Sequence, residues 1–118
     1  MVLPADDASV LRGHAIYDTI HLVNGHLYQL PEALDRLFAS CQAARIVPPL
    51  GIDDLRRVIL HTAAASTSWD GVVKVWVSGG RGDVKLSDLG KGRGRACLYV
   101  TVTPLAVEEP DLGTCFFL

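Results

Sequence analysis

The sequence lacks the patterns that mark several common classes of protein. It has no Cys-X-X-Cys pair, its four histidines show no ligand spacing, and its three cysteines are odd in number and widely separated, so we expect neither a zinc site nor a disulfide framework. Its apolar runs fall far short of a bilayer span, which predicts no membrane partner. The net charge of −2 gives no general attraction to nucleic acid.

The composition is that of a folding chain. Of the 118 residues, 49% are apolar and 20% are charged, which predicts one domain or a piece of a larger protein. The cysteines are expected to be reduced thiols, and residues 1–7 (MVLPADD) resemble neither a signal peptide nor a transit peptide. These features predict a soluble intracellular protein, although an upstream targeting segment could have been lost.

The clearest local signal is a β-hairpin. Residues 16–23 mix β-branched, aromatic and apolar types, as strands do. Asn24-Gly25 suits the two positive-φ positions of a type I′ turn. The sequence therefore predicts that residues 26–30 return as the second strand.

Two helices are predicted to follow. Pro31 and Glu32 suit a first helical turn, and an apolar stripe follows at three- and four-residue steps (Leu34, Leu37, Phe38, Cys41, Ala44). Pro48-Pro49 is expected to end this helix. Asp53 is predicted to cap a second helix, whose packing face is Leu55, Val58, Ile59 and Ala63.

Two further strands complete the pattern. Residues 72–77 and 96–102 read as strands, and Gly-rich loops are predicted at residues 79–83 and 90–95. Neither loop precedes a helix, as a phosphate-binding P-loop would. The order hairpin, helix, helix, strand, loop, strand predicts an α+β fold, with a largely antiparallel sheet and helices on one face.

Few side chains point to chemistry when each is taken alone. Arg36 lies roughly 160–200° from the middle of the apolar stripe at about 100° per residue, so it faces away from the helix core contact and could bind a dianion or simply be solvated. Tyr17 could line a pocket or be a half-buried strand residue. Lys85 and Lys91 lie in predicted loops, and Lys74 alternates with apolar neighbours, so it should point to the less buried face of its strand.

Three segments in order are more specific than any single residue. Residues 12–19 (RGHAIYDT), 23–25 (VNG) and 34–40 (LDRLFAS) resemble the small N-terminal domain of fold-type IV (class IV) pyridoxal-phosphate aminotransferases. The plant subgroup of D-amino acid transaminases and aminodeoxychorismate lyases is the most similar. The resemblance predicts this domain over residues 1–105, incomplete at its start, and a truncated tail or the start of an interdomain linker over residues 106–118.

The resemblance also implies roles for particular residues. Arg36 matches the arginine that binds the phosphate of pyridoxal 5′-phosphate, Tyr17 matches an aromatic residue beside cofactor and substrate, and Arg81 lies near a loop that contacts substrate carboxylates. The implied substrates are an amino acid and a 2-oxo acid, or aminodeoxychorismate, in a homodimer when full length and in the cytoplasm or a plastid. No catalytic residue is assigned, because the Schiff-base lysine is expected to lie outside this chain, which should be inactive alone.

A second hypothesis comes from the end of the sequence. Residues 115–118 (CFFL) are apolar, and burying each large apolar side chain is worth about 1.5–3 kcal/mol. The alternative is therefore a non-catalytic interaction domain that reuses the small-domain fold and associates with another protein through this tail.

Overall fold

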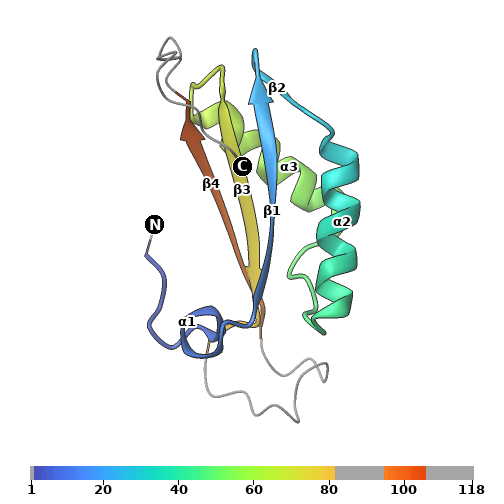
Figure 1. Ribbon diagram of the computed structural model, residues 1–118, viewed down its shortest axis with the longest axis vertical. Helices are drawn as coiled ribbons and strands as arrows, with labels where there is room; N and C mark the ends of the chain where they lie inside the picture. Colours follow the sequence, from blue (N-terminus) through green and yellow to red (C-terminus); the bar gives the residue numbers. More distant parts are fainter. Residues whose placement is uncertain (1, 82–94, 106–118) are drawn as a thin grey trace, which may run out of the picture.

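A four-stranded antiparallel sheet with helices against one face organises the chain in a computed structural model, which describes residues 2–81 and 95–105 (Figure 1). The elements are α1 (Ala8–Arg12), β1 (Ala15–Val23), β2 (His26–Leu27), α2 (Leu30–Ala43), α3 (Ile52–Ala65), β3 (Gly71–Ser78) and β4 (Cys97–Pro104). The strand order is β2-β1-β3-β4. The predicted α+β class is confirmed.

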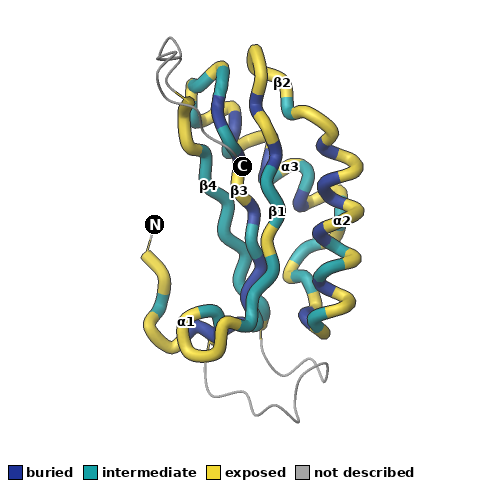
Figure 2. Tube along the Cα trace, viewed as in Figure 1, coloured by how far each residue is buried: buried dark blue, intermediate teal, exposed yellow. Residues whose placement is uncertain are grey.

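The strand register gives the sheet two different faces. Val73, Val75 and Val77 on β3 are at most 1% exposed, and they pack with α2 and α3 in one apolar core. Figure 2 shows the buried residues of the helices turned toward the strands. The alternating residues of β3, including Lys74 and Trp76, lie on the opposite face, which neither long helix covers.

The predicted hairpin turn is confirmed. Asn24 and Gly25 have φ values of 48° and 75°, as a type I′ turn requires. The returning strand is shorter than predicted: only His26 and Leu27 pair with β1. Leu30, expected to end that strand, is instead buried at the start of α2.

Helix α2 ends earlier than Pro48-Pro49 suggested. Arg45 adopts a left-handed φ of 57°, the Arg45 N–H donates to Gln42 O, and the Ile46 N–H donates to Cys41 O at 2.9 Å. These bonds form a Schellman motif, which closes the last carbonyls of the helix and buries Ile46. The stop is therefore set by backbone geometry, and the prolines follow it.

The cap predicted for the second helix is wrong by two residues. Gly51 is the N-cap of α3, and the Leu55 N–H donates to Gly51 O. Asp53 lies within the first turn, where its carboxylate still suits the helix dipole. Of the predicted packing face, Leu55, Ile59 and Ala63 are buried and Val58 is partly buried.

Several sequence predictions lie outside the described residues. They concern the loop at residues 90–94, Lys85, Lys91 and the tail at residues 106–118. Within the described ranges, no helix is long and apolar enough to cross a membrane.

Candidate functional site

Arg36 lies midway along α2 and reaches the edge of β1. Its side chain is 56% exposed, so it lies off the apolar stripe as predicted. Its guanidinium donates from Nε to Asp18 Oδ2 at 2.9 Å and from Nη2 to Asp18 Oδ1 at 3.3 Å. The hydrogen bond and the charge of Asp18 raise the pKa of Arg36, so the arginine remains a cation.

The remaining donors of Arg36 suit an anion. A guanidinium carries five N–H groups in a rigid planar fork. Asp18 takes the edge formed by Nε and Nη2, and Nη1 has no partner among the described residues. The end of the fork, formed by Nη1 and Nη2, has the geometry that binds a phosphate by two parallel hydrogen bonds. These residues therefore fit a phosphate group.

Tyr17 begins a row of aromatic rings on the uncovered face of the sheet. Tyr17 lies opposite Trp76 in the β1–β3 register, and Trp76 lies opposite Tyr99. The Trp76 and Tyr99 ring centroids are 5.5 Å apart. Tyr17 is 64% exposed. This face offers flat apolar walls to a ligand of similar shape.

Lys74 adds a cation to that row. Its Nζ lies 4.6 Å from the centroid of the Tyr17 ring and 5.8 Å from that of Trp76. The prediction that Lys74 points to the less buried face is therefore confirmed. No role was predicted for Lys74 from the sequence, because its only distinguishing feature there is its alternation with valines. Beside two rings, its ammonium group can attract a carboxylate.

Arg81 lies just beyond the end of β3, at the same end of the sheet as the start of β1. Ser78, three residues earlier, pairs with Ala15. The Arg81 Nε donates to Asp6 Oδ1 at 2.9 Å, and the two side chains are 63% and 50% exposed. The hydrogen bond and charge of Asp6 raise the pKa of Arg81. The structure thus holds Arg81 against the N-terminal segment rather than against Arg36.

The carboxylate that fixes this end of the sheet was missed in the sequence. Asp7 is 0% exposed. Its Oδ1 accepts from the Ser9 N–H and Oγ at 2.8 and 2.7 Å, and its Oδ2 accepts from Ser78 Oγ and Tyr99 Oη, both at 2.9 Å. Asp7-Ala8-Ser9 is a recognisable N-cap pattern for a helix. Nothing local in the sequence indicates that Ser78 and Tyr99 also bind Asp7.

Burial and hydrogen bonding oppose each other at Asp7. Burial by itself would raise the pKa of this carboxyl, but the hydrogen bonds from Ser9, Ser78 and Tyr99 together lower it below its ordinary value. Burial and the neighbouring Asp7 carboxylate raise the pKa of Tyr99. The pair is therefore a carboxylate and a protonated phenol at neutral pH, which is a structural arrangement.

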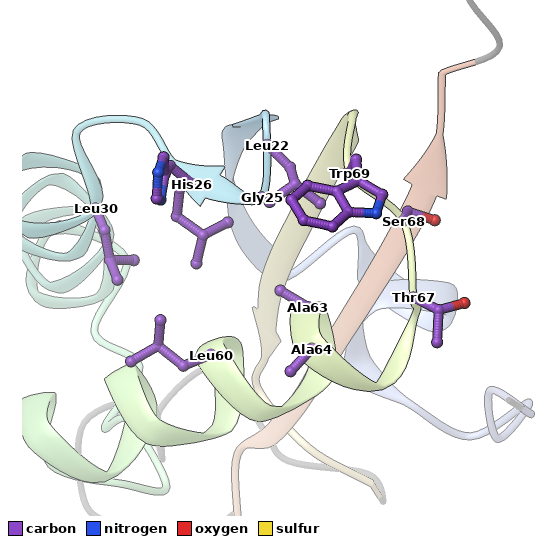
Figure 3. A pocket seen from close by; sticks show the side chains of 11 residues that line it. Leu22, Gly25, His26, Leu30, Leu60, Ala63, Ala64, Thr67, Ser68 and Trp69 are labelled. Atoms are coloured by element: carbon purple, nitrogen blue, oxygen red, sulfur yellow. The ribbon is translucent and has the colours of Figure 1, made fainter.

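A separate hollow of about 650 Å³ lies between the hairpin turn and α3 (Figure 3). Trp69, Leu30 and Leu60 line it, and the Trp69 ring lies beside Gly25. Among the described residues, its lining contains no lysine, arginine, aspartate or glutamate. It therefore lacks the charges that would hold an amino acid or a phosphate.

The fold defines a class. An α+β domain with helices on one face of an antiparallel sheet is the fold of fold-type IV aminotransferases. The chain belongs to the class IV aminotransferase family, whose model matches residues 15–115. This family consists of enzymes, transaminases and lyases among them.

Individual relatives agree with this assignment. The chain is 41% identical over 87 residues to the chloroplastic D-amino-acid transaminase of Arabidopsis thaliana, covering 74% of this chain and 23% of the relative. A putative 4-amino-4-deoxychorismate lyase from Legionella pneumophila has the same fold, with a TM-score of 0.78 and 18% identity over 92% of this chain and 39% of that one.

A hypothetical aminotransferase from Mycobacterium tuberculosis, solved with α-ketoglutarate and PMP bound, superimposes with a TM-score of 0.68 and 25% identity. It covers 91% of this chain and 35% of that one. The chain thus spans well under half the length of each of these three relatives.

Proposed function

We propose that this chain supplies one wall of the active site of a pyridoxal-phosphate-dependent aminotransferase that exchanges amino groups between amino acids and 2-oxo acids. The observation that carries the proposal is the two-donor end of the Arg36 fork, left open where α2 meets Asp18 on the helix-covered face of β1. The 41% identity to a D-amino-acid transaminase favours transamination over lyase chemistry. At 18% identity, the Legionella lyase supports the fold alone.

In this proposal the chain's own residues bind the cofactor and the substrate and set their orientation. Arg36 would hold the cofactor phosphate through Nη1 and Nη2, and Tyr17, on the uncovered face of the sheet, would form a wall beside the cofactor and substrate. Lys74, midway along β3, or Arg81, beyond the end of β3, would attract a substrate carboxylate, because both are cations. When bound, pyridoxal phosphate supplies the electron sink for the reaction.

We also propose that these 118 residues alone do not turn over. A Schiff-base lysine must be held in a partly desolvated pocket, whereas Lys74, the one lysine among the described residues, is exposed. Residues 1–105 would form the small domain, and residues 106–118 would begin a linker toward the rest of a longer, homodimeric enzyme. The compared relatives, of which this chain spans 23–39%, support that proposal.

Paired ligands test the role of Arg36 in the 118-residue chain. Pyridoxamine 5′-phosphate and pyridoxamine differ only in the phosphate and lack the aldehyde that reacts with lysines. We expect the phosphate ester to bind about 3- to 10-fold more tightly by NMR titration, the range for one partly exposed charge-assisted contact. Arg36→Ala should remove that difference, and Arg56→Ala, on an exposed face of α3, should retain it.

The same titration tests the alternative of a non-catalytic interaction domain. Equal binding of the two ligands, or an Arg36→Ala variant indistinguishable from wild type, would contradict the cofactor role and favour that alternative. Transamination by the chain alone, with one lysine trapped by borohydride in the presence of pyridoxal phosphate, would contradict the proposed inactivity.

A further inference from the structure

We infer that Asp18 is a positioning residue for Arg36: it holds one edge of the guanidinium so that the other edge faces a phosphate. The inference rests on the proposed role of Arg36. Asp18 itself would not touch the phosphate. It would act by fixing the orientation of the group that does.

The Asp18 carboxylate is held firmly enough to orient Arg36. It lies within β1, opposite Val75 in the β1–β3 register, and its side chain is 19% exposed, against 56% for Arg36. Its Oδ1 also accepts the Thr19 N–H at 2.7 Å. A carboxylate bound to its own strand has little rotational freedom, so the direction of its lone pairs is set by the sheet.

Because the Asp18 carboxylate is fixed, its contact with Arg36 also fixes the guanidinium. Two donors on one edge, Nε and Nη2, meet the two oxygens of one carboxylate. A two-point contact between planar groups fixes the plane and direction of the fork, which a single contact does not. An unpaired arginine on an exposed helix face would sample many rotamers, and binding an anion would require it to give up that freedom.

The second arginine of the candidate site provides a comparison. Arg81 meets Asp6 through Nε alone, and both of those side chains are at least half exposed. Arg81 is therefore tethered at one point, whereas Arg36 is oriented at two. Among the described ion pairs, the Asp18–Arg36 pair is the one in which a strand carboxylate takes both donors of an arginine edge.

Charge and orientation predict opposite effects of Asp18→Asn on the affinity for a phosphate. Removing a negative charge near an anion site strengthens anion binding if charge alone matters. If orientation matters more, the same substitution weakens binding, because an amide offers one acceptor oxygen in place of two. The sign of the change therefore separates the two accounts.

The experiment measures affinity for pyridoxamine 5′-phosphate and the Arg36 Nε–H resonance in the 118-residue chain. We expect Asp18→Asn to weaken binding about 3- to 10-fold, the range for ordering one long side chain, and to lose the protection of the Nε–H from exchange with water. Asp18→Glu should restore both in part. Asp53→Asn, which removes the same charge from an exposed pair on α3, should change neither.

The outcomes distinguish this inference from the proposed function. If Arg36→Ala binds the ligand as wild type does, the phosphate role of Arg36 is wrong. If Arg36→Ala loses affinity while Asp18→Asn binds equally well or more tightly, Arg36 binds the phosphate but Asp18 does not position it. Far-UV circular dichroism of each variant identifies a change that comes from unfolding. If Asp18→Asn is unfolded, Asp18→Glu is measured in its place: weaker binding than wild type supports the positioning role, and unchanged binding contradicts it.

Discussion

At the scale of single residues, Asp7 is the most constrained polar side chain described. A fully buried carboxylate accepts four hydrogen bonds and joins α1 to β3 and β4. The Ser78 hydroxyl also accepts the Gly80 N–H, so the same network fixes the backbone that leads to Arg81. Asp7 therefore connects the stability of the fold to the placement of a candidate site residue.

We expect Asp7→Asn to lower the free energy of unfolding by about 1–3 kcal/mol at pH 7, because hydrogen bonds to a buried charge are replaced by weaker or mismatched ones. Urea denaturation measures this loss. Asp6→Asn, in an exposed ion pair, should cost at most about 1 kcal/mol. Equal losses in the two variants would contradict the special role of Asp7.

The effect of Asp7→Asn should also depend on pH. The folded pKa of Asp7 is lowered, so its ionisation adds stability above the unfolded pKa of about 3.9. That contribution is lost as the pH falls through the folded pKa. The difference between wild type and Asp7→Asn should therefore shrink below about pH 4, and a difference that stays constant would show that Asp7 does not ionise as described.

At the scale of elements, the sequence predicted what local signals control. The hairpin turn, the two long helices, the two later strands and the exposed position of Arg36 all follow from turn residues and apolar spacing. Helix α1 was missed because it has only five residues, and its cap, Asp7, is held by Ser78 and Tyr99, which lie 71 and 92 residues away. The Asp18–Arg36 pair was missed for the same reason, since it depends on how α2 lies against β1.

The hairpin turn makes a specific prediction about Gly25. Its φ is +75°, and a Cβ there would lie 3.2 Å from the Trp69 ring. Gly25→Ala should cost about 1–2 kcal/mol for the left-handed backbone and up to about 1 kcal/mol more for the crowding. Thermal or urea denaturation measures the total.

Gly13 is a matched control for the backbone term. Its φ is +63°, but a Cβ there meets nothing within 4 Å, so Gly13→Ala should show the backbone cost alone. In a Trp69→Ala background, Gly25→Ala should cost no more than Gly13→Ala. A loss that is unchanged by removing Trp69 would show that the ring does not constrain the turn.

At the scale of the whole molecule, the two faces of the sheet present different surfaces. One face is covered by α2 and α3 and contains the core (Figure 2). The other presents Tyr17, Lys74 and Trp76 without a helix above them. An enzyme that needs a flat, partly apolar wall with a few cations can obtain it from such an uncovered face, while the covered face keeps the wall rigid.

A single core also predicts a single unfolding transition. The apolar cluster includes residues of β1, α2, α3 and β3, with β4 packed against it, so losing any one of these elements exposes the others.

Ile59, at 0% exposed on α3, lies in this cluster, whereas its neighbour Leu60 is 46% exposed. We expect Ile59→Ala to cost about 2–5 kcal/mol and Leu60→Ala less than about 1.5 kcal/mol. In both variants, fluorescence from Trp76 in β3 and Trp69 just before it, and far-UV circular dichroism, to which the helices contribute most, should give coincident urea transitions. Separate transitions would mean that the helices and the sheet unfold as independent units, and the wall that carries Tyr17 and Lys74 would then not depend on the core behind it.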